Sequence, residues 1–217
     1  MSGTRFVFKT NTNIGSQTVQ LRHKGLWLSK GDNKVITGEI MRARGMLSAT
    51  IAAIYNGLDS TARGYAETYF LTPPTGPDVG QKQKIMSILE LTYHGLSNDF
   101  TLKLGGDGDF GFVTRHGVNP GTQGSAVDPE DGTSWTRDGH AIHVSKKRML
   151  KNHDIGVITI IHEGSHKFAN TWDHGNKGYR EEDDSGWWAP GLTTAEALEN
   201  ADSYAYFAFR VGAACGW

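Results

Sequence analysis

The sequence predicts an α+β fold, mainly helical with a small antiparallel sheet, and three observations carry this prediction. Long stretches repeat apolar residues at helical spacing, shorter stretches alternate apolar and polar residues, and turns rich in glycine and proline separate them. The chain has 217 residues, enough for one domain with a sizeable core. We expect residues 36–217 to form that domain and residues 1–35 to form an N-terminal extension whose role the sequence does not indicate.

In the first half of the chain, strands are expected before helices. Residues 1–35 alternate loosely between apolar and polar side chains, which predicts two or three short strands. Apolar residues at helical spacing predict helices over residues 36–64 and 79–95. The segment 73–78, PPTGPD, has the composition of a turn and separates the two helices.

In the second half, a hairpin region is expected to precede two helices. Residues 100–146 contain short apolar runs around glycine-rich turns, which is typical of β-hairpins. Helical spacing predicts helices over residues 154–169 and 193–212. The segment 170–192 between these helices has no periodicity, so we expect it to be a loop.

Charge and composition argue against several kinds of protein. The chain has 22 basic and 23 acidic residues, a formal net charge of -1, which does not favour nucleic acid or an anionic membrane as the main partner. The longest aliphatic run, residues 155–161, is far shorter than the roughly 20 residues that span a bilayer, so membrane insertion is not expected. The single cysteine, Cys215, allows no disulfide within the chain. The N-terminus lacks the apolar segment of a secretory signal, so we expect synthesis in the cytoplasm.

The most informative stretch is ITIIHEGSHKFANTWDH, residues 158–174. His162 and His166 are four residues apart, so on a helix they lie on one face, about one turn from each other. Zinc accepts imidazole nitrogen as a ligand, and this spacing lets two rings converge on one ion. Glu163 lies one residue further round the helix, where it can reach a water on the metal. The pattern H-E-x-x-H therefore suits a zinc-activated water with a carboxylate as general base.

Two histidines on a helix can also be exposed residues or satisfied core residues. The flanking apolar residues are Ile155, Ile158, Ile161 and Phe168, which predict a buried helix. Burying two imidazoles and a carboxylate without partners costs several kcal/mol, and a metal removes much of that cost. We therefore expect Zn²⁺ at this position.

A catalytic zinc site needs a third protein ligand and an open position. Asp173 and His174 lie just past the expected helix end, where a chain reversal could bring either side chain back to the ion. The acidic run 181–184 is most simply a solvated loop. Asp202 lies on an otherwise apolar stripe of the last expected helix, so it is either paired or part of a site. The residues alone leave Asp173 and Asp202 open as third ligand.

Three segments together resemble a known family. HEGSH at 162–166, NTWD at 170–173 and NADSYAYF at 200–207 are similar to segments of the aspzincin metalloendopeptidases, which comprise the deuterolysins and the peptidyl-Lys metallopeptidases. Related domains occur in bacterial effectors and toxins. The resemblance is clearest over residues 155–210, and it implies a zincin-like metallopeptidase domain. It also implies that His162, His166 and Asp173 bind zinc and that Glu163 is the general base.

The resemblance also implies groups on the substrate side. The family uses a tyrosine after the third ligand to stabilise the oxyanion; the expected spacing gives Asn176 here, so Tyr179 is the candidate. Tyr204 and Tyr206 are further possibilities for this role. Asp202 corresponds to an aspartate that approaches the S1′ pocket. We therefore predict Asp202 and Tyr204 as substrate-binding residues.

The sequence predicts a zinc-dependent endopeptidase that acts on a protein or peptide substrate. One alternative is that the same site cuts peptidoglycan cross-links as an antibacterial effector, and another is a zinc-stabilised binding module without catalysis. The toxin-like resemblance adds a cognate immunity protein or secretion machinery as partners. It also adds delivery by a specialised secretion system as an expectation.

Overall fold

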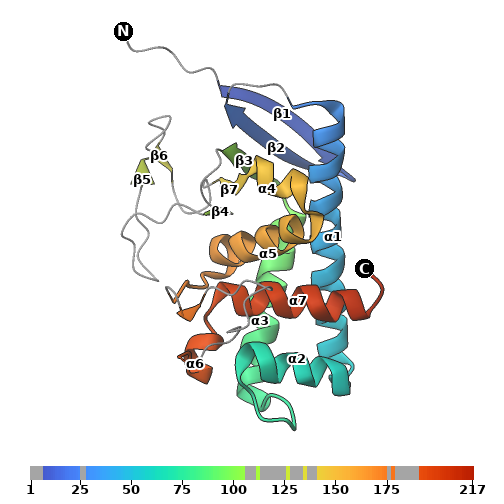
Figure 1. Cartoon of the computed structure of the whole chain (residues 1–217), viewed down its shortest axis with the longest axis vertical. Helices are drawn as coiled ribbons and strands as arrows, with labels where there is room; N and C mark the ends of the chain where they lie inside the picture. Colours follow the sequence, from blue (N-terminus) through green and yellow to red (C-terminus); the bar gives the residue numbers. More distant parts are fainter. Residues whose placement is uncertain are drawn as a thin grey trace.

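The structure is a computed structural model that describes residues 7–24, 28–105, 111–112, 126–127, 134–135, 141–174, 177–178 and 191–217. Within these ranges a body of helices carries a mixed sheet at one end (Figure 1). The predicted α+β class is confirmed.

The helices form a crossed arrangement. They are α1 (Lys30–Tyr55), α2 (Ser60–Phe70), α3 (Val79–Ser97), α4 (Lys146–Lys151), α5 (His153–Ala169), α6 (Thr194–Ala197) and α7 (Ala201–Ala214). Helices α5 and α7 lie side by side and run across α1 and α3 (Figure 1). Close approach of α7 to α1 depends on Gly212, because a Cβ there would lie 2.7 Å from the Cα of Met46. Among the described residues, no helix has the length and apolar character needed to cross a bilayer.

The helices predicted over residues 79–95 and 154–169 are confirmed by α3 and α5. The single helix predicted over residues 36–64 is wrong, because the chain forms α1 and α2 with a break between them. Asp59 begins α2 by accepting a hydrogen bond from the backbone N–H of Ala62 at 2.8 Å. The helix predicted over residues 193–212 is likewise divided into α6 and α7.

The main sheet has five strands in the order β1-β2-β3-β7-β4. Their bounds are β1 (Val7–Ile14), β2 (Gln17–Lys24), β3 (Phe100–Gly105), β4 (Gly111–Phe112) and β7 (Ile142–Ser145). β2 pairs with β3, and β3 with β7, in parallel, whereas the β1–β2 and β4–β7 pairs are antiparallel. The small sheet that was predicted to be antiparallel is therefore mixed, with two parallel and two antiparallel pairings among the described strands. Three helices lie between β2 and β3, and such a crossover returns the chain to run parallel.

The predicted hairpins of residues 100–146 fall largely outside the described residues. A separate antiparallel pair, β5 (Ala126–Val127) with β6 (Ser134–Trp135), lies in this region. The outer strands of the region, β3 and β7, pair with each other in parallel, so they do not form a hairpin.

The N-terminal strands take part in the same core as the helices. Val19 and Leu21 of β2 are fully buried, and Leu21 pairs in register with Leu102 of β3. The core continues through α1, α3, α5 and α7. The division between residues 1–35 and residues 36–217 stays a prediction, but β2 adds apolar area to a core that the helices share.

Candidate metal centre

The position of the candidate site is set by α5. Its N-terminus is capped by Asn152, whose Oδ1 accepts hydrogen bonds from the N–H groups of Asp154 and Ile155 at 3.0 and 3.2 Å. Every residue from 156 to 166 is buried. The helix ends at Asn170, which has a left-handed backbone with φ of 61°. This conformation turns the chain back along the last turn of α5, so that the next residues face the two histidines.

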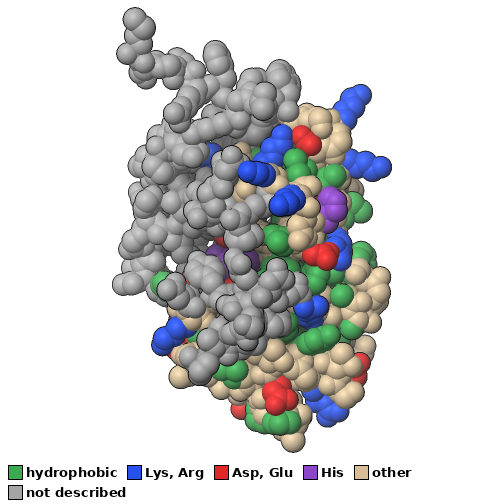
Figure 2. Space-filling view, viewed as in Figure 1, with side chains coloured by type: hydrophobic (Ala, Val, Ile, Leu, Met, Phe, Trp, Pro, Cys, Tyr) green, Lys and Arg blue, Asp and Glu red, His purple; other side chains and the backbone are tan. Residues whose placement is uncertain are grey.

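Three side chains converge at this end of α5. The Nε2 atoms of His162 and His166 are 3.0 Å apart. Asp173 Oδ1 lies 3.1 Å from His166 Nε2 and 3.2 Å from His162 Nε2. Among the described residues, these three form the group of metal-ligating side chains close enough to hold one ion. Histidine side chains, in purple, are visible near the middle of the face drawn in Figure 2.

The hydrogen bonds of the outer ring nitrogens fix the tautomers. His162 Nδ1 is 2.5 Å from Asp202 Oδ1, and His166 Nδ1 is 2.9 Å from the carbonyl oxygen of Thr171. A carboxylate and a carbonyl only accept, so both Nδ1 atoms carry the proton. Each neutral ring then directs an Nε2 lone pair at the other ring and at the Asp173 carboxylate. Three acceptors that face one another repel, and a metal ion or an added proton removes that repulsion.

Without a metal, the charges of the cluster depend on one another. Burial lowers the pKa of His162, but Asp202, Asp173 and Glu163 outweigh it and hold the pKa well above its usual value. Burial lowers the pKa of His166, and the charge of His162 lowers it further. Burial raises the pKa of Asp173, but the two histidines outweigh it and hold the pKa well below its usual range. Because metal and proton compete for the same ligand atoms, metal binding at this cluster is expected to depend on pH.

The donor set fits zinc. Zinc–nitrogen and zinc–oxygen bonds of about 2.0–2.2 Å in a tetrahedron place ligand atoms about 3.3–3.6 Å apart. The three distances in the cluster are 3.0, 3.1 and 3.2 Å, so the side chains would move only slightly outward around the ion. Two imidazoles and one carboxylate make three protein ligands, which leaves a fourth position open, as in catalytic rather than structural zinc sites.

Glu163 lies beside this donor set without belonging to it. Its Oε1 is 3.9 Å from His162 Nε2, which is longer than the distances within the cluster. The residue is buried. A carboxylate next to an open metal position, but outside ligand distance, can accept a proton from a water there.

The two candidates for third ligand lie on different sides of His162. Asp173 faces the Nε2 atoms, whereas Asp202 bonds to the opposite nitrogen of His162. Asp202 lies on α7, and the contact of α7 with α5 brings it there. Asp202 is thus placed to orient His162 from behind, and its predicted contact with substrate stays a prediction.

The predicted tyrosines are placed differently. Tyr179 lies outside the described residues. Tyr204 is fully buried, its hydroxyl donates to the carbonyl of Leu198 at 2.7 Å, and its ring packs on Phe70. Burial raises its pKa. Tyr204 therefore lies in the core, and its predicted contact with substrate stays a prediction.

Two further residues support the centre and were missed by reasoning from sequence. The Thr171 carbonyl binds His166, and the Thr171 hydroxyl is 2.7 Å from that of Ser165. Ser165 also donates to the carbonyl of His162 at 2.7 Å. Ser165 lies within the HEGSH segment and Thr171 follows the helix end. Their closeness to the two histidines in the sequence is the signal that marks both as candidates for bonding to them.

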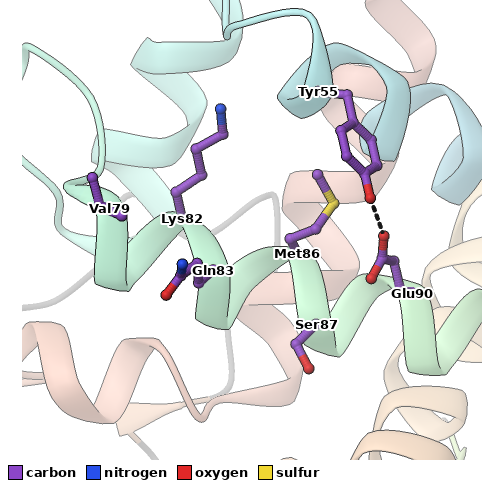
Figure 3. A pocket seen from close by; sticks show the side chains of 7 residues that line it. All are labelled: Tyr55, Val79, Lys82, Gln83, Met86, Ser87 and Glu90. Carbon is purple, nitrogen blue, oxygen red and sulfur yellow. Dashed lines mark hydrogen bonds between the residues drawn. The ribbon is translucent and has the colours of Figure 1, made fainter.

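A groove of about 460 Å³ lies elsewhere, between the end of α1 and one face of α3 (Figure 3). Tyr55 and Met86 line it, and Tyr55 donates to Glu90 at 2.9 Å. None of the candidate site residues lines it, and among its described walls no group of metal ligands converges.

Comparisons with known proteins bear on the fold. No protein-family model matches the sequence, and no curated protein matches it. Among solved structures, the chain is similar to a zinc peptidase from Grifola frondosa, with a TM-score of 0.57 and 13% sequence identity. The similarity covers 84% of this chain and 96% of that chain. At this identity the likeness shows a shared fold.

Proposed function

We propose that this chain is a zinc-dependent endopeptidase of the aspzincin type. The observation that carries the proposal is the convergence of three metal-ligating atoms, from His162, His166 and Asp173, beside Glu163. The fold shared with a zinc peptidase supports the same reading. The resemblance of residues 155–210 to aspzincin segments supports the aspzincin type in particular.

His162, His166 and Asp173 would hold the zinc ion. When bound, zinc supplies a Lewis acid that polarises a carbonyl and makes a water molecule more acidic. Asp202 keeps the proton of His162 on Nδ1, and Thr171 does the same for His166, so that each Nε2 presents its lone pair toward the ion's position. These two partners also hold the rings in place before the ion arrives.

Glu163 is the general base of the proposed reaction. Its carboxylate accepts a proton from water as the water attacks the peptide carbonyl, and it then passes that proton to the leaving amine. Tyr179 is proposed as the group that shares the oxyanion, on the resemblance alone. A buried carboxylate at this position has no use in a purely structural zinc site, which supports catalysis over a binding module.

The test combines metal content with cleavage of a protein substrate. We expect one zinc per wild-type chain by mass spectrometry and cleavage of casein. Glu163→Gln should keep the zinc and lose turnover about 10²–10⁴-fold, because only the proton transfer is removed. Glu67→Gln, on the exposed face of α2, is the matched control and should behave as wild type.

Two results would contradict the proposal. If the wild-type chain does not bind zinc in a stoichiometric amount, the proposed metal centre is wrong. If Glu163→Gln keeps full activity, Glu163 is not the general base. Purified peptidoglycan sacculi, tested in parallel, separate a protein substrate from a cell-wall substrate: cleavage of sacculi without cleavage of casein would keep the centre and change the substrate.

A further inference from the structure

The backbone on either side of Asp173 is attached to the segment around Asn200. On the first side, the backbone of Trp172 bridges Asn200: Trp172 N–H donates to the carbonyl of Glu199 at 2.7 Å, and Ala201 N–H donates to the carbonyl of Trp172 at 2.9 Å. On the other side, the Asn200 side-chain Nδ2 donates to the carbonyl of Gly178 at 3.1 Å. Asp173 lies between these two attachments.

The side chain of Asn200 does not perform the task expected at its position. Asn200 is the N-cap residue of α7, and asparagine is favoured there because its oxygen accepts from the first turn of the helix. Here the side chain makes no capping bond. Its Nδ2 instead donates to Gly178 and, at 3.2 Å, to the hydroxyl of Ser203. The carboxamide therefore bonds both to Gly178 and to a side chain in the first turn of α7, without making the backbone capping bond.

Contact between this carboxamide and the loop backbone is direct. Asn200 is fully buried. A Cβ added at Gly178 would collide with Asn200 Oδ1 and would lie 2.8 Å from the backbone nitrogen of His174. Position 178 thus has room for glycine only, and the backbones of His174 and Gly178 lie close together beside the carboxamide.

These attachments matter because Asp173 is held differently from the two histidines. His162 and His166 are fixed by a buried helix, whereas Asp173 belongs to a short loop and its side chain is 33% exposed. On one side of Asp173, Thr171 and Trp172 attach the chain to α5 and to residue 199. On the other side, the described attachment is the bond from Asn200 to Gly178.

We propose that Asn200 is a positioning residue for the third ligand: its carboxamide holds the backbone at Gly178, which lies against His174, so that the Asp173 carboxylate faces both histidines before a metal binds. The inference rests on the proposed function, because it assigns Asn200 a role toward the same zinc ion. Groups that bond directly to a metal ligand typically change metal affinity by about 10–100-fold when they are removed, and Asn200 acts through the backbone that carries the ligand.

The test is a double-mutant cycle between Asn200 and Asp173, read as zinc affinity of the full chain in competition with a chelator. Asn200→Asp keeps the shape but has no N–H to donate to Gly178. We expect this variant to weaken zinc binding about 10–100-fold in the wild-type background. In the Asp173→Ala background it should change zinc affinity by less than about 3-fold, because the residue through which it acts is gone.

Ser203→Ala is the matched control. It removes the other bond of Nδ2 and leaves the bond to Gly178, so zinc affinity should stay at the wild-type value. The unfolding temperature of each metal-free variant separates loss of zinc affinity from loss of fold. If Asn200→Asp does not fold, Gly178→Ala replaces it, because the added Cβ would push the backbone of residue 178 away from the Asn200 carboxamide. Gly178→Ala is then combined with Asp173→Ala in the same double-mutant cycle.

An equal loss of zinc affinity in both backgrounds would overturn the inference, because Asn200 would then act on the fold as a whole. Unchanged affinity in the wild-type background would overturn it as well. Neither result touches the proposed function as long as the wild-type chain binds zinc and cleaves substrate. A wild-type chain without zinc rejects the proposed function first.

Discussion

At the scale of single residues, the two histidines of the metal centre differ in what holds them. His162 Nδ1 is bonded to the carboxylate of Asp202, and His166 Nδ1 to the neutral carbonyl of Thr171. A carboxylate partner increases the basicity of an imidazole ligand more than a carbonyl does, and it also adds charge near the ion. We therefore expect His162 to be the more tightly bound ligand and Asp202 to matter for zinc affinity.

Asp202→Ala should weaken zinc binding about 10–100-fold, because His162 loses the group that fixes its tautomer. Asp202→Asn should weaken it less, since the amide oxygen can still accept from Nδ1–H. Competition with a chelator measures both variants. If both bind zinc as wild type does but lose preference for a basic residue after the cut bond, Asp202 belongs to the S1′ side, as the resemblance implies.

At the scale of elements, the contact between α1 and α5 contains a buried acid. Glu39 of α1 is 3% exposed, and its carboxylate packs against Gly156 in the first turn of α5. Its Oε1 is 3.0 Å from His153 Nδ1, and Oε2 is buried without a described partner. Burial raises the pKa of Glu39 to about 7, although His153 and Arg42 oppose the shift.

The sign of the pH effect follows from that pKa. The folded-state pKa lies above the ordinary value of 4.5, so stability from this group is complete below about pH 4.5 and is lost as pH rises through about 7. The difference between the ordinary pKa and the folded-state pKa corresponds to about 3 kcal/mol in the free energy of unfolding. Glu39→Gln cannot ionise, so its free energy of unfolding relative to wild type should rise between pH 5 and pH 8. Urea unfolding at both pH values measures this; parallel pH profiles would exclude ionisation of Glu39 as a source of pH dependence.

Helices were predicted well where the sequence pattern that marks them lies within the helix itself. The helices around residues 79–97 and 153–169 have strong apolar spacing and were predicted within two residues. The start of α1 was placed too late, although Ser29 and Asp32 form a capping box there. The break before α7 was missed because the side chain of Asn200 is directed at a distant loop, and apolar spacing contains no sign of that contact.

At the scale of the whole molecule, the candidate site could be predicted only in part. His162, Glu163 and His166 share one helix, so their spacing placed them together. The choice between Asp173 and Asp202 depends on a left-handed turn at Asn170 and on the packing of α7 against α5, neither of which follows from spacing. The sheet was expected to be antiparallel because residues 100–146 have the pattern of hairpins. The parallel pairing of β2 with β3 joins strands on either side of three helices, and no local pattern indicates it.

The place of β2 in the core leads to a prediction about the N-terminal strands. Leu21→Ala should lower the free energy of unfolding by about 2–5 kcal/mol, because Leu21 is fully buried and its removal leaves a cavity. Leu91→Ala, on a side chain that is 48% exposed, is the control and should cost much less. Denaturant unfolding measures both. A negligible effect of Leu21→Ala would mean that residues 1–35 form an extension on which the helical core does not depend.

The parallel pairing of β2 with β3 also affects how the chain reaches its fold. β2 is synthesised before α1, α2 and α3, and its partner β3 follows only after them. Closing so long a loop costs chain entropy, so contacts among the helices, which are nearer in sequence, should form first. Until β3 emerges, β2 presents an open strand edge with Val19 and Leu21 unburied, which favours pairing with other chains. The growing polypeptide is therefore most prone to aggregate while its helices are being made and before its sheet is complete.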